Sequence, residues 1–510
     1  MPDKYLVGLD IGGTFVKAVV FAVDGRELGT GSASIPVTAT NAGWSDIDPD
    51  LFWDRTSGSI RAALAASAID PRDIAGVGLS GTGNGLAILD ASMRTVRPII
   101  LSSDTRAAGI VEEWQAADLP TATFPVIRQG LWSGQPAALL AWFARYEPAT
   151  YARVAHAMLC KDWVRHRLTG EIGTDLTDAT AAGLTDVVSG TYAFSVFEML
   201  GLRDLGRLLP PIAPSAAVGG RVTEEAAAAT GLMAGTPVAV GLFDCAATAV
   251  GAGCLDPGQV CLIVGTWSIN EVVIDEPILA PSIAFETAHA PRDRWLLLEA
   301  SQTSATNLAW YLDQFGLAES EEAKRRGTDV YSVLDKILAS TPVGAAGVSF
   351  HPYLRGSVTN PAARAAVVGL GAWHDRSHVI RAVYEGIAFS HLDHVARLRE
   401  VVPVGEVRLT GGGSRSAVWS QMFADILGVP AVVPPTTEAG ACGAAIDAAV
   451  AVGLVDDHAA GYRRLVSGQG RRYEPDPAMR AAYDGAHELF AATADALAAV
   501  ERRAPQEAVS

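Results

Sequence analysis

Two segments in different halves of the 510-residue chain share one pattern, and this repetition constrains the fold more than any other feature of the sequence. In each segment an apolar run leads to a glycine and a threonine, and a second apolar run follows. The segments are residues 5–21, around Gly13-Thr14, and residues 258–274, around Gly265-Thr266. Two apolar runs joined by a short turn that contains glycine are typical of a β-hairpin. The same hairpin is therefore expected twice.

Further matches extend the repetition beyond the hairpins. Residues 77–83 correspond to residues 407–413, since each is an apolar run that ends in glycines. An apolar run, an acid and a small-residue helix occur at residues 237–253 and again at 430–452. The shared order predicts an internal duplication. Because the chain is too long for one core, we expect two α/β domains, residues 1–253 and 254–510, that face each other across a cleft.

The first hairpin carries side chains that an ordinary turn does not need. Asp10, Thr14 and Lys17 surround Gly12-Gly13, a pair that lets the backbone turn sharply and approach a ligand. Successive N–H groups in such a turn can bind an anion, so the hairpin is a candidate phosphate and Mg²⁺ site. The alternative is a plain hairpin whose aspartate caps the turn. In the second copy Leu262 replaces Asp10, which assigns the metal to the first hairpin.

Composition excludes several classes of partner. The formal net charge of −17 argues against nucleic acid or an anionic membrane as the main partner. It also means that a bound polyphosphate needs local cations such as Mg²⁺. The longest uncharged stretches, residues 226–243 and 337–354, are interrupted by glycine and proline, so no membrane span is expected. Five cysteines without a CxxC pair, and no cleavable signal, favour a cytoplasmic protein with reduced thiols.

Three common nucleotide-binding schemes fail. No lysine follows a glycine as a P-loop requires, the Gly-x-Gly runs lack the third glycine of a dinucleotide fingerprint, and protein-kinase motifs are absent. The remaining motifs resemble the superfamily of sugar kinases, actin and heat-shock chaperones; they are Asp10-x-Gly-Gly-Thr-x-x-Lys17, Gly265-Thr266, Gly411-Gly412-Gly413-Ser414 and Glu438-x-Gly440-x-x-Gly443. This resemblance implies an α/β fold of two duplicated actin-like (ribonuclease H-like) ATPase domains with an interdomain cleft.

Within that superfamily the chain is similar to the FGGY carbohydrate kinases over essentially its full length. The motifs that carry this likeness are Gly43-Trp44-x-x-x-Asp48-Pro49, Phe243-Asp244-x-Ala-x-x-Ala249-x-Gly251 and Tyr384-Glu385-Gly386. Residues 79–85, 100–106 and 131–136 look most like the branch of L-xylulose and erythritol kinases. Typical D-xylulose kinases have a Met-His pair where this chain has Gly83-Asn84. The resemblance implies that residues 1–253 bind sugar and supply a base, and that residues 254–510 bind nucleotide.

The resemblance also assigns roles to individual residues. Asp244 follows a strand and precedes a helix, and it is implied to be the general base for the sugar hydroxyl; the alternative is that it only caps the helix. Asp10 and Asp244 are implied to lie at the Mg²⁺ ion. The residues implied to bind ATP are Gly12, Gly13, Thr14, Lys17, Gly265 and Thr266 at the phosphates, and Gly411, Gly412, Gly413, Ser416, Glu438 and Gly440 near the adenosine.

The expected sugar site combines an acceptor, a fork of donors and an apolar wall. Asp104 and Arg106 would bind vicinal hydroxyls, although a structural ion pair in a turn is the alternative for them. The residues expected at the sugar are Trp44, Thr82, Gly83, Asn84, Asp104, Arg106 and Asp244.

One further pair of side chains needs an interpretation. His391 and His394 lie three residues apart on a helix predicted over residues 376–399. Two histidines without a third ligand are more often surface or core residues than a metal site.

These features predict ATP-dependent phosphorylation of a small sugar hydroxyl, with L-xylulose or 3-keto-L-gulonate as the expected substrate. Alternatives within the class are erythritol or another polyol, D-xylulose and ribulose. A different class is an actin- or chaperone-like ATPase, which would lack a sugar loop such as residues 81–85 with 104–106. The expected partner is a small sugar, with no nucleic acid and no membrane, and a homodimer is the candidate assembly.

Overall fold

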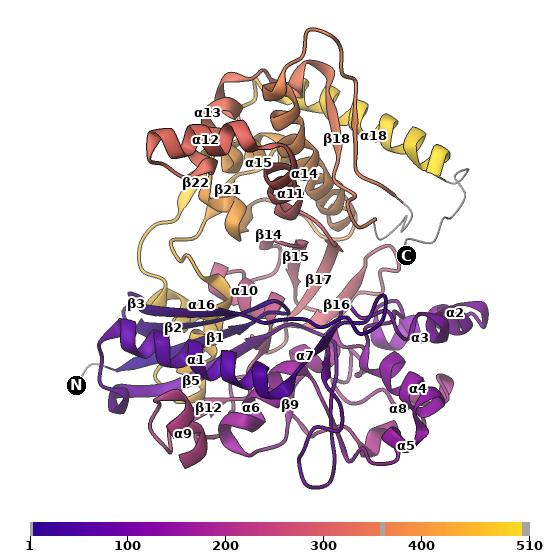
Figure 1. Cartoon of the computed structure of the whole chain (residues 1–510), viewed down its shortest axis with the longest axis vertical. Coiled ribbons are helices and arrows are strands. Elements are labelled where there is room, and N and C mark those ends of the chain that lie inside the picture. The colour runs from indigo at the N-terminus through magenta and orange to yellow at the C-terminus, as the bar shows by residue number, and fades with distance from the viewer. Residues whose placement is uncertain (1–3, 357–362, 502–510) are drawn as a thin grey trace. The chain divides into compact units, whose positions relative to one another are not determined.

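The computed structural model describes residues 4–356 and 363–501, and the chain divides into two compact units. The first unit comprises Met1–Pro257, Val273–Leu297 and Glu438–Gly468. The second comprises Gly258–Val272, Leu298–Thr437 and Gln469–Ser510. Two later segments therefore return to the unit in which the chain begins, as the colours of Figure 1 show for α16.

The first unit is built on a seven-stranded sheet in the order β11-β12-β5-β1-β2-β3, with β13 also paired to β5. β1 and β2 form the predicted hairpin, in which Asp10 lies opposite Lys17, and β1 runs parallel to β5. The strands are β1 (Tyr5–Ile11), β2 (Phe15–Ala22), β3 (Glu27–Ser34), β5 (Ile74–Gly81), β11 (Val218–Arg221), β12 (Pro237–Ala239) and β13 (Leu242–Phe243).

Helix α16 (Ala439–Ala451) packs unusually closely on β1 and β5 of this sheet. A β-carbon on Gly8 would overlap the carbonyl oxygen of Ala441, and one on Gly78 would overlap that of Ala444. Glycine at both positions is therefore required for the helix backbone to approach the strands. The same helix also packs against α10 (Asp244–Ala252).

Helix α1 (Pro49–Ser67) covers β2 and β3 and begins where the sequence predicts. The backbone N–H of Leu51 donates to Oδ1 of Asp48 over 2.9 Å, and Pro49 occupies the first helical turn. An aspartate cap followed by proline satisfies the free N–H groups at a helix start, so the predicted cap is confirmed.

The rest of the first unit is mainly helical, and part of it forms a separate apolar core around Leu139, Phe143 and Phe197. Its helices are α2 (Ala108–Ala116), α3 (Leu119–Ile127), α4 (Pro136–Tyr146), α5 (Pro148–Tyr151), α6 (Cys160–Thr169), α7 (Leu176–Ala181), α8 (Phe194–Met199), α9 (Glu224–Thr230) and α17 (His458–Leu465). Its short strands are β4 (Asp46–Ile47), β6 (Ala87–Leu89), β7 (Ile99–Ile100), β8 (His156–Met158), β9 (Thr174–Asp175) and β10 (Ile212–Ala213).

A second seven-stranded sheet has the order β16-β17-β15-β14-β20-β21-β22. β14 and β15 form the second predicted hairpin, and β14 runs parallel to β20 as β1 does to β5. The duplication predicted from the sequence is thus present in the strand pairing. The strands are β14 (Val260–Val264), β15 (Ser268–Ile274), β16 (Phe285–Ala288), β17 (Trp295–Ser301), β20 (Val407–Thr410), β21 (Ala431–Val433) and β22 (Arg471–Tyr473).

The helices of the second unit include the predicted long helix, α14 (Arg376–Arg399), whose Asp375 forms a capping box with His378. The others are α11 (Ala305–Phe315), α12 (Leu317–Arg326), α13 (Val330–Ser340), α15 (Ala417–Leu427) and α18 (Arg480–Glu501). A two-stranded sheet pairs β18 (Ser349–His351) with β19 (Ala366–Val368).

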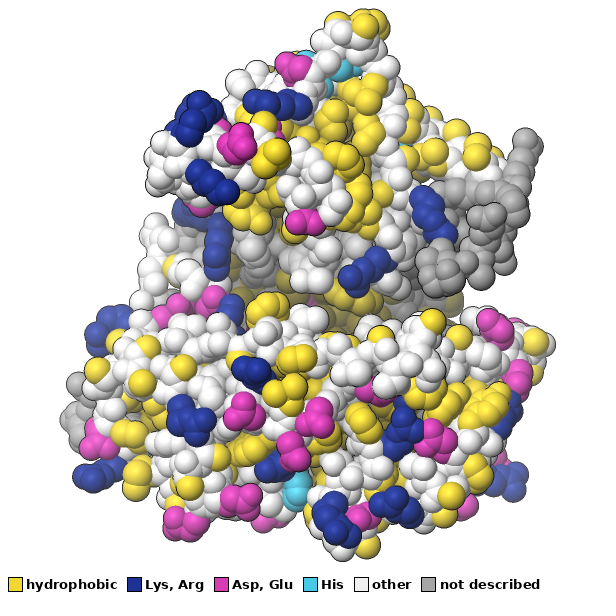
Figure 2. All heavy atoms as spheres, in the orientation of Figure 1, with side chains coloured by type: hydrophobic (Ala, Val, Ile, Leu, Met, Phe, Trp, Pro, Cys, Tyr) yellow, Lys and Arg dark blue, Asp and Glu magenta, His cyan; other side chains and the backbone are white. Residues whose placement is uncertain are grey.

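Charges of both signs occur on the surface (Figure 2), and the length and hydropathy of the helices bear on a possible membrane span. On the face drawn in Figure 2, acidic and basic side chains are interspersed, so the net charge of −17 is not gathered there into one acidic field. Among the helices of the described residues, none has the length and apolar character that crossing a membrane requires.

Candidate active site

Three strand ends meet at one edge of the first sheet. Asp10 pairs with Ser80 in the register of β1 and β5, and Ser80 pairs with Leu242 in the register of β5 and β13. β13 ends at Phe243, so Asp244 follows it immediately. Ligands in open α/β sheets gather at the carboxyl ends of parallel strands, and this edge is therefore the candidate active site of the first unit.

Asp10 is held from two sides. The hydroxyl of Ser80 donates to its Oδ1 over 3.3 Å, and Gly440 at the start of α16 lies against its Oδ2. Burial raises the pKa of Asp10, while the charge of Lys17 acts in the opposite direction. A half-buried carboxylate with few protein partners is suited to a cation or to another strongly polar ligand.

Lys17 and Glu438 form an ion pair, with 2.6 Å between Nζ and Oε2. Glu438 directly precedes α16, and the pair ties the first hairpin to that helix within the first unit. Glu438 and Gly440 were expected near the adenosine, and the structure places both of them beside the Asp10 hairpin. Thr14, at the tip of the hairpin, is exposed and its hydroxyl is accessible to a ligand.

Asp244 is the first residue of α10, and Phe243 occupies the position before the helix without a side-chain cap. Asp244 is thus not at the cap position itself, although backbone N–H groups at the helix start, including that of Cys245, interact with its carboxylate. Burial, followed by the negative charge of Asp10, raises the pKa of Asp244 to about 7. A carboxylate with a pKa near neutrality is well matched to general-base catalysis.

A buried charge cluster that the sequence analysis missed lies behind Asp244. The Nζ of Lys161 is 2.6 Å from Asp162 and 3.1 Å from Asp175, and all these side chains are fully buried. Asp178 is also buried, 3.8 Å from the same nitrogen.

This Lys161 cluster is connected to the segment that precedes Asp244. The hydroxyl of Thr177 donates to Asp175 over 2.6 Å and accepts from the backbone N–H of Phe243 over 2.9 Å. The cluster therefore fixes the residue that precedes Asp244. Lysine is scarce in this sequence, and the motif Lys161-Asp162 at a helix start was the signal that could have drawn attention to it.

The donor set fits Mg²⁺. Asp10 and Asp244 lie close enough that the charge of one raises the pKa of the other. Among the described residues no group of three or more His, Cys, Asp and Glu side chains could form an all-protein metal cage. Mg²⁺ is commonly held by one or two carboxylates together with water and substrate phosphates, which is the set that these two aspartates offer.

Two residues of the predicted sugar loop lie at the same strand edge. The backbone N–H of Thr82 donates to the carbonyl of Ile11, and Gly83 lies against the ring of Phe243. Asn84 adopts a left-handed backbone conformation (φ 64°) and is almost fully buried. Its Nδ2 donates to Ala181 over 3.4 Å, and among the described residues its Oδ1 has no hydrogen-bond partner. A buried free acceptor suits a sugar hydroxyl.

Asp104 and Arg106 form a fully buried ion pair. The guanidinium binds both Asp104 oxygens, at 2.9 and 2.8 Å, and also contacts Asp46. The backbone N–H groups of Ser45 and Arg106 complete the acceptor capacity of Asp104. The guanidinium carbon of Arg106 lies over the ring of Trp44, 4.0 Å from the centre of that ring. These contacts favour the structural alternative for the pair, although Nη1 of Arg106 has no partner among the described residues. Direct sugar contacts by Asp104 and Arg106 stay a prediction.

In the second unit, the turn Gly265-Thr266 is fixed through its carbonyl groups. The backbone N–H of Ala305 donates to Gly265, and that of Ser304 and the hydroxyl of Thr306 donate to Thr266, over 2.8–3.1 Å. Because the peptide bonds are trans, the N–H of each peptide points away from its carbonyl. The N–H groups of Thr266 and Trp267 therefore point away from α11, as an anion-binding turn requires.

The predicted glycine run also lies at a strand end in this unit. Gly411 has a φ of 82°, and β-carbons on Gly411 and Gly413 would overlap Val264. A β-carbon on Gly412 would meet nothing within 4 Å, so Gly412 borders open space. Ser416 caps α15 and donates to Oδ1 of Asp335 over 2.6 Å.

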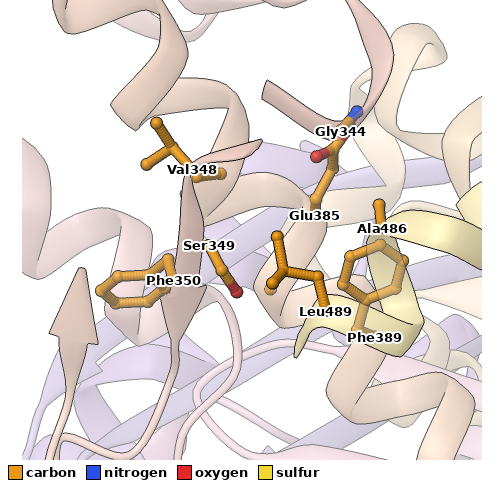
Figure 3. A pocket seen from close by; sticks show the side chains of 10 residues that line it. Gly344, Val348, Ser349, Phe350, Glu385, Phe389, Ala486 and Leu489 are labelled. Carbon is orange, nitrogen blue, oxygen red and sulfur yellow. The ribbon is translucent and has the colours of Figure 1, made fainter. Parts of the chain in front are cut away.

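The Tyr384-Glu385-Gly386 motif has a packing role in the second unit. Glu385 is buried in α14 and accepts from the backbone N–H of Gly344 over 3.0 Å and from Arg381 over 2.7 Å. Figure 3 shows Glu385 beside Gly344 at a small pocket whose other walls include Phe350 and Leu489. The motif thus joins α14 to a neighbouring turn.

Comparison with known proteins decides the family. Residues 5–251 match the N-terminal domain and residues 260–452 the C-terminal domain of the FGGY family of carbohydrate kinases. The chain belongs to the FGGY family of carbohydrate kinases. As an FGGY kinase it uses ATP as the phosphate donor and a carbohydrate as acceptor, which sets aside the actin- or chaperone-like alternative.

Individual relatives of this FGGY kinase match along nearly all of their length. A probable L-xylulose kinase of Pasteurella multocida is 33% identical over 98% of this chain and 100% of its own. The L-xylulose/3-keto-L-gulonate kinase of Escherichia coli is 34% identical over 91% of each chain. The crystal structure of xylulose kinase from Rhodospirillum rubrum has a TM-score of 0.85 at 28% identity, covering 98% of this chain and 100% of that one. The predicted fold class and enzyme class are confirmed.

Proposed function

We propose that this FGGY kinase transfers the γ-phosphoryl group of ATP to a hydroxyl of a ketopentose or of its keto-acid relative. L-Xylulose and 3-keto-L-gulonate are the first candidates, because the relatives that are 33% and 34% identical carry those names. The free Oδ1 of buried Asn84 supports recognition of a hydroxyl in the first unit.

The observation that carries the proposal is the position of Asp244. It lies half-buried at the carboxyl edge of the sheet, beside Asp10, with a pKa raised to about 7. In the proposed reaction its carboxylate accepts the proton of the sugar hydroxyl. That oxygen forms a bond to the γ-phosphorus, the bond from this phosphorus to the β–γ bridging oxygen breaks, and ADP leaves. A positioned base contributes about 10²–10⁴ in rate.

The remaining groups position ATP and neutralise its charge, which is most of the work in phosphoryl transfer. Asp10 would hold hydrated Mg²⁺, which when bound supplies positive charge to the phosphate oxygens. We assign the phosphates to Gly12, Gly13 and Thr14 and to the turn Gly265-Thr266. Lys17, already paired with Glu438, would add a supporting charge.

The adenosine is assigned to the surface of Gly412 in the second unit. Open space at Gly412 supports this assignment. Because the Ser416 hydroxyl already caps α15 and donates to Asp335, Ser416 would contribute through its backbone.

A coupled assay of ADP release tests the proposal. Purified enzyme is supplied with ATP, Mg²⁺ and one acceptor at a time: L-xylulose, 3-keto-L-gulonate, D-xylulose, ribulose or erythritol. The proposal expects the largest kcat/KM with one of the first two. A larger kcat/KM with erythritol or D-xylulose would make that compound the assigned substrate, and the protein would still be a carbohydrate kinase.

Asp244→Asn tests the role of the base. The variant is expected to bind ADP as the wild type does and to lose at least about 99% of kcat, since the base contributes 10²–10⁴. Asp24→Asn, at an exposed turn paired with Arg26, is the matched control and should turn over normally. Turnover by Asp244→Asn above about a tenth of the wild-type rate would remove Asp244 from the mechanism.

A further inference from the structure

His391 lies on α14, fully buried, inside a network of four polar side chains of the second unit. Its Nδ1 is 2.7 Å from Oδ1 of Asn270, and its Nε2 is 2.9 Å from the hydroxyl of Ser304. The hydroxyl of Ser268 lies 3.2 Å from both ring nitrogens. Nothing in the mechanism above uses this histidine.

The partners determine the protonation of the ring. The Nδ2 of Asn270 donates to the carbonyl of Glu299 over 3.2 Å, so Oδ1 of Asn270 faces His391 as an acceptor. Nδ1 of His391 therefore donates, which leaves Nε2 to accept from the hydroxyl of Ser304. Burial lowers the pKa of His391 to about 3, which agrees with a neutral ring.

Ser304 connects this network to the turn Gly265-Thr266. Its side chain is fixed by His391, while its backbone N–H donates to the carbonyl of Thr266 over 3.1 Å. The next residue, Ala305, donates to the carbonyl of Gly265 over 2.9 Å. On the other side of the turn, Ser268 and Asn270 belong to β15. His391 thus contacts Ser304, whose backbone holds the turn, and also β15, the strand that follows the turn.

We propose that His391 is a positioning residue, which aims the N–H groups of Thr266 and Trp267 at the β- and γ-phosphates of ATP. The role rests on the proposed function of that turn. A trans peptide whose carbonyl is held by α11 must direct its N–H group the other way. A shift of Ser304 would leave the carbonyl of Thr266 held by the hydroxyl of Thr306 alone, so the N–H of Trp267 would be less firmly directed at the ligand.

Binding of ADP and AMP separates this role from a purely structural one. AMP lacks the phosphate groups assigned to the turn, so loss of the network should weaken ADP binding and leave AMP binding unchanged. His391→Leu removes both hydrogen bonds at similar volume. We expect the dissociation constant for ADP to rise about tenfold, as the loss of one or two buried hydrogen bonds predicts. The KM for sugar should not change.

Three further variants complete the test. His391→Gln can donate to Asn270 and accept from Ser304, so it should restore most of the ADP affinity. Ser304→Ala removes the hydroxyl and keeps the backbone, and should raise the ADP constant at least about threefold even if His391→Leu fails to fold. His394→Gln is the matched control, because His394 contacts Glu299 and lies one turn along the same helix.

The outcomes are distinguishable. Equal weakening of ADP and AMP, or no change with Ser304→Ala, would overturn the positioning role while the wild-type kinase remains active. If the wild type itself bound ADP no better than AMP, the assignment of the phosphates to this turn would fall, and the role of His391 with it. Calorimetric titration of all five proteins with both nucleotides, without sugar, provides every value required.

Discussion

A β-carbon on Gly440 would lie 2.9 Å from the Oδ2 atom of Asp10, although 430 positions in the sequence separate the two residues. The helix start of α16 therefore limits where the carboxylate can be. A β-carbon at position 440 would clash only with the end of the Asp10 side chain, so the protein can accommodate it by moving that carboxylate while the backbone stays in place.

We expect Gly440→Ala to lower kcat about tenfold or more and to change the melting temperature little, since the displaced carboxylate is the proposed metal ligand. Gly58→Ala is the control: nothing lies within 4 Å of a β-carbon there, inside α1. It should stabilise the protein by up to about 1 kcal/mol with normal turnover. Unchanged kcat in Gly440→Ala would show that the position of Asp10 is not critical. Steady-state kinetics and thermal unfolding provide both readings.

The raised pKa of Asp244 implies a cost in stability that depends on pH. The folded pKa of Asp244, about 7, lies above the ordinary aspartate value of 3.8. The folded state therefore holds this proton more tightly than the unfolded state does, and wild-type stability falls as the pH rises from about 4 to about 7. Asp244→Asn has no such proton to lose. We expect the free energy of unfolding of the variant, relative to the wild type, to increase by roughly 2 kcal/mol between about pH 5.5 and 8.5.

Urea unfolding of the ligand-free proteins at both pH values checks this expectation. Asp24→Asn is again the control, because Asp24 is exposed and its pKa is lowered by Arg26, so no such gain should appear. If the difference in unfolding free energy between Asp244→Asn and the wild type were the same at both pH values, the pKa of Asp244 would not be raised in the folded protein.

Arg106 is expected to contribute more to folding than to sugar binding. Arg106→Met leaves the buried carboxylates of Asp104 and Asp46 without their cation, which should lower the free energy of unfolding by about 3–5 kcal/mol. Arg145→Met removes an exposed pair with Glu113 and should have no measurable effect. Chemical denaturation of both variants tests this difference. Normal stability in Arg106→Met, with a raised KM for sugar, would instead favour the direct-contact interpretation.

Lys161→Met should be among the most damaging single substitutions in the first unit. It leaves three buried carboxylates, Asp162, Asp175 and Asp178, without their lysine, at a cost of at least about 3–5 kcal/mol. Burial raises the pKa of Asp175 and Asp178, so protonation at lower pH should reduce the loss. Lys336→Met, at an exposed position on α13, is the control. Equal stability of Lys161→Met and wild type at neutral pH would contradict the cluster.

Local patterns in the sequence were enough to predict much of the fold. The two hairpins, the Asp48 cap and helix α14 depend on neighbouring residues, and the structure has each of them. The position of Asp244 between a strand and a helix was also predicted from local information, and its role as base, which the resemblance implies, stays a prediction.

Features that depend on distant partners were missed. The ion pair of Glu438 with Lys17, 421 residues away, was not predicted, while the expected place of Glu438 near the adenosine stays a prediction. In the sequence Lys161 is indistinguishable from an ordinary surface lysine, whereas in the structure it is buried with three carboxylates around it. The carboxylate of Asp104 accepts hydrogen bonds from the side chain and backbone of Arg106 and from the backbone N–H of Ser45. The contact with Ser45 forms only when two distant turns come together in the fold. Charged residues that pair over a long distance in the sequence produce no periodic pattern from which the pairing could be predicted.

The return of α16 to the first sheet has a consequence for how the chain is made. The strands β1 and β5 emerge early from the ribosome, but the helix that covers them is separated from the first hairpin by about 421 residues. At about 5–20 residues per second, synthesis leaves that glycine-rich face of the sheet uncovered for roughly 20–80 s. During this interval the nascent chain exposes apolar strand surface to chaperones and to neighbouring chains, and the first unit becomes complete only when most of the protein has been translated.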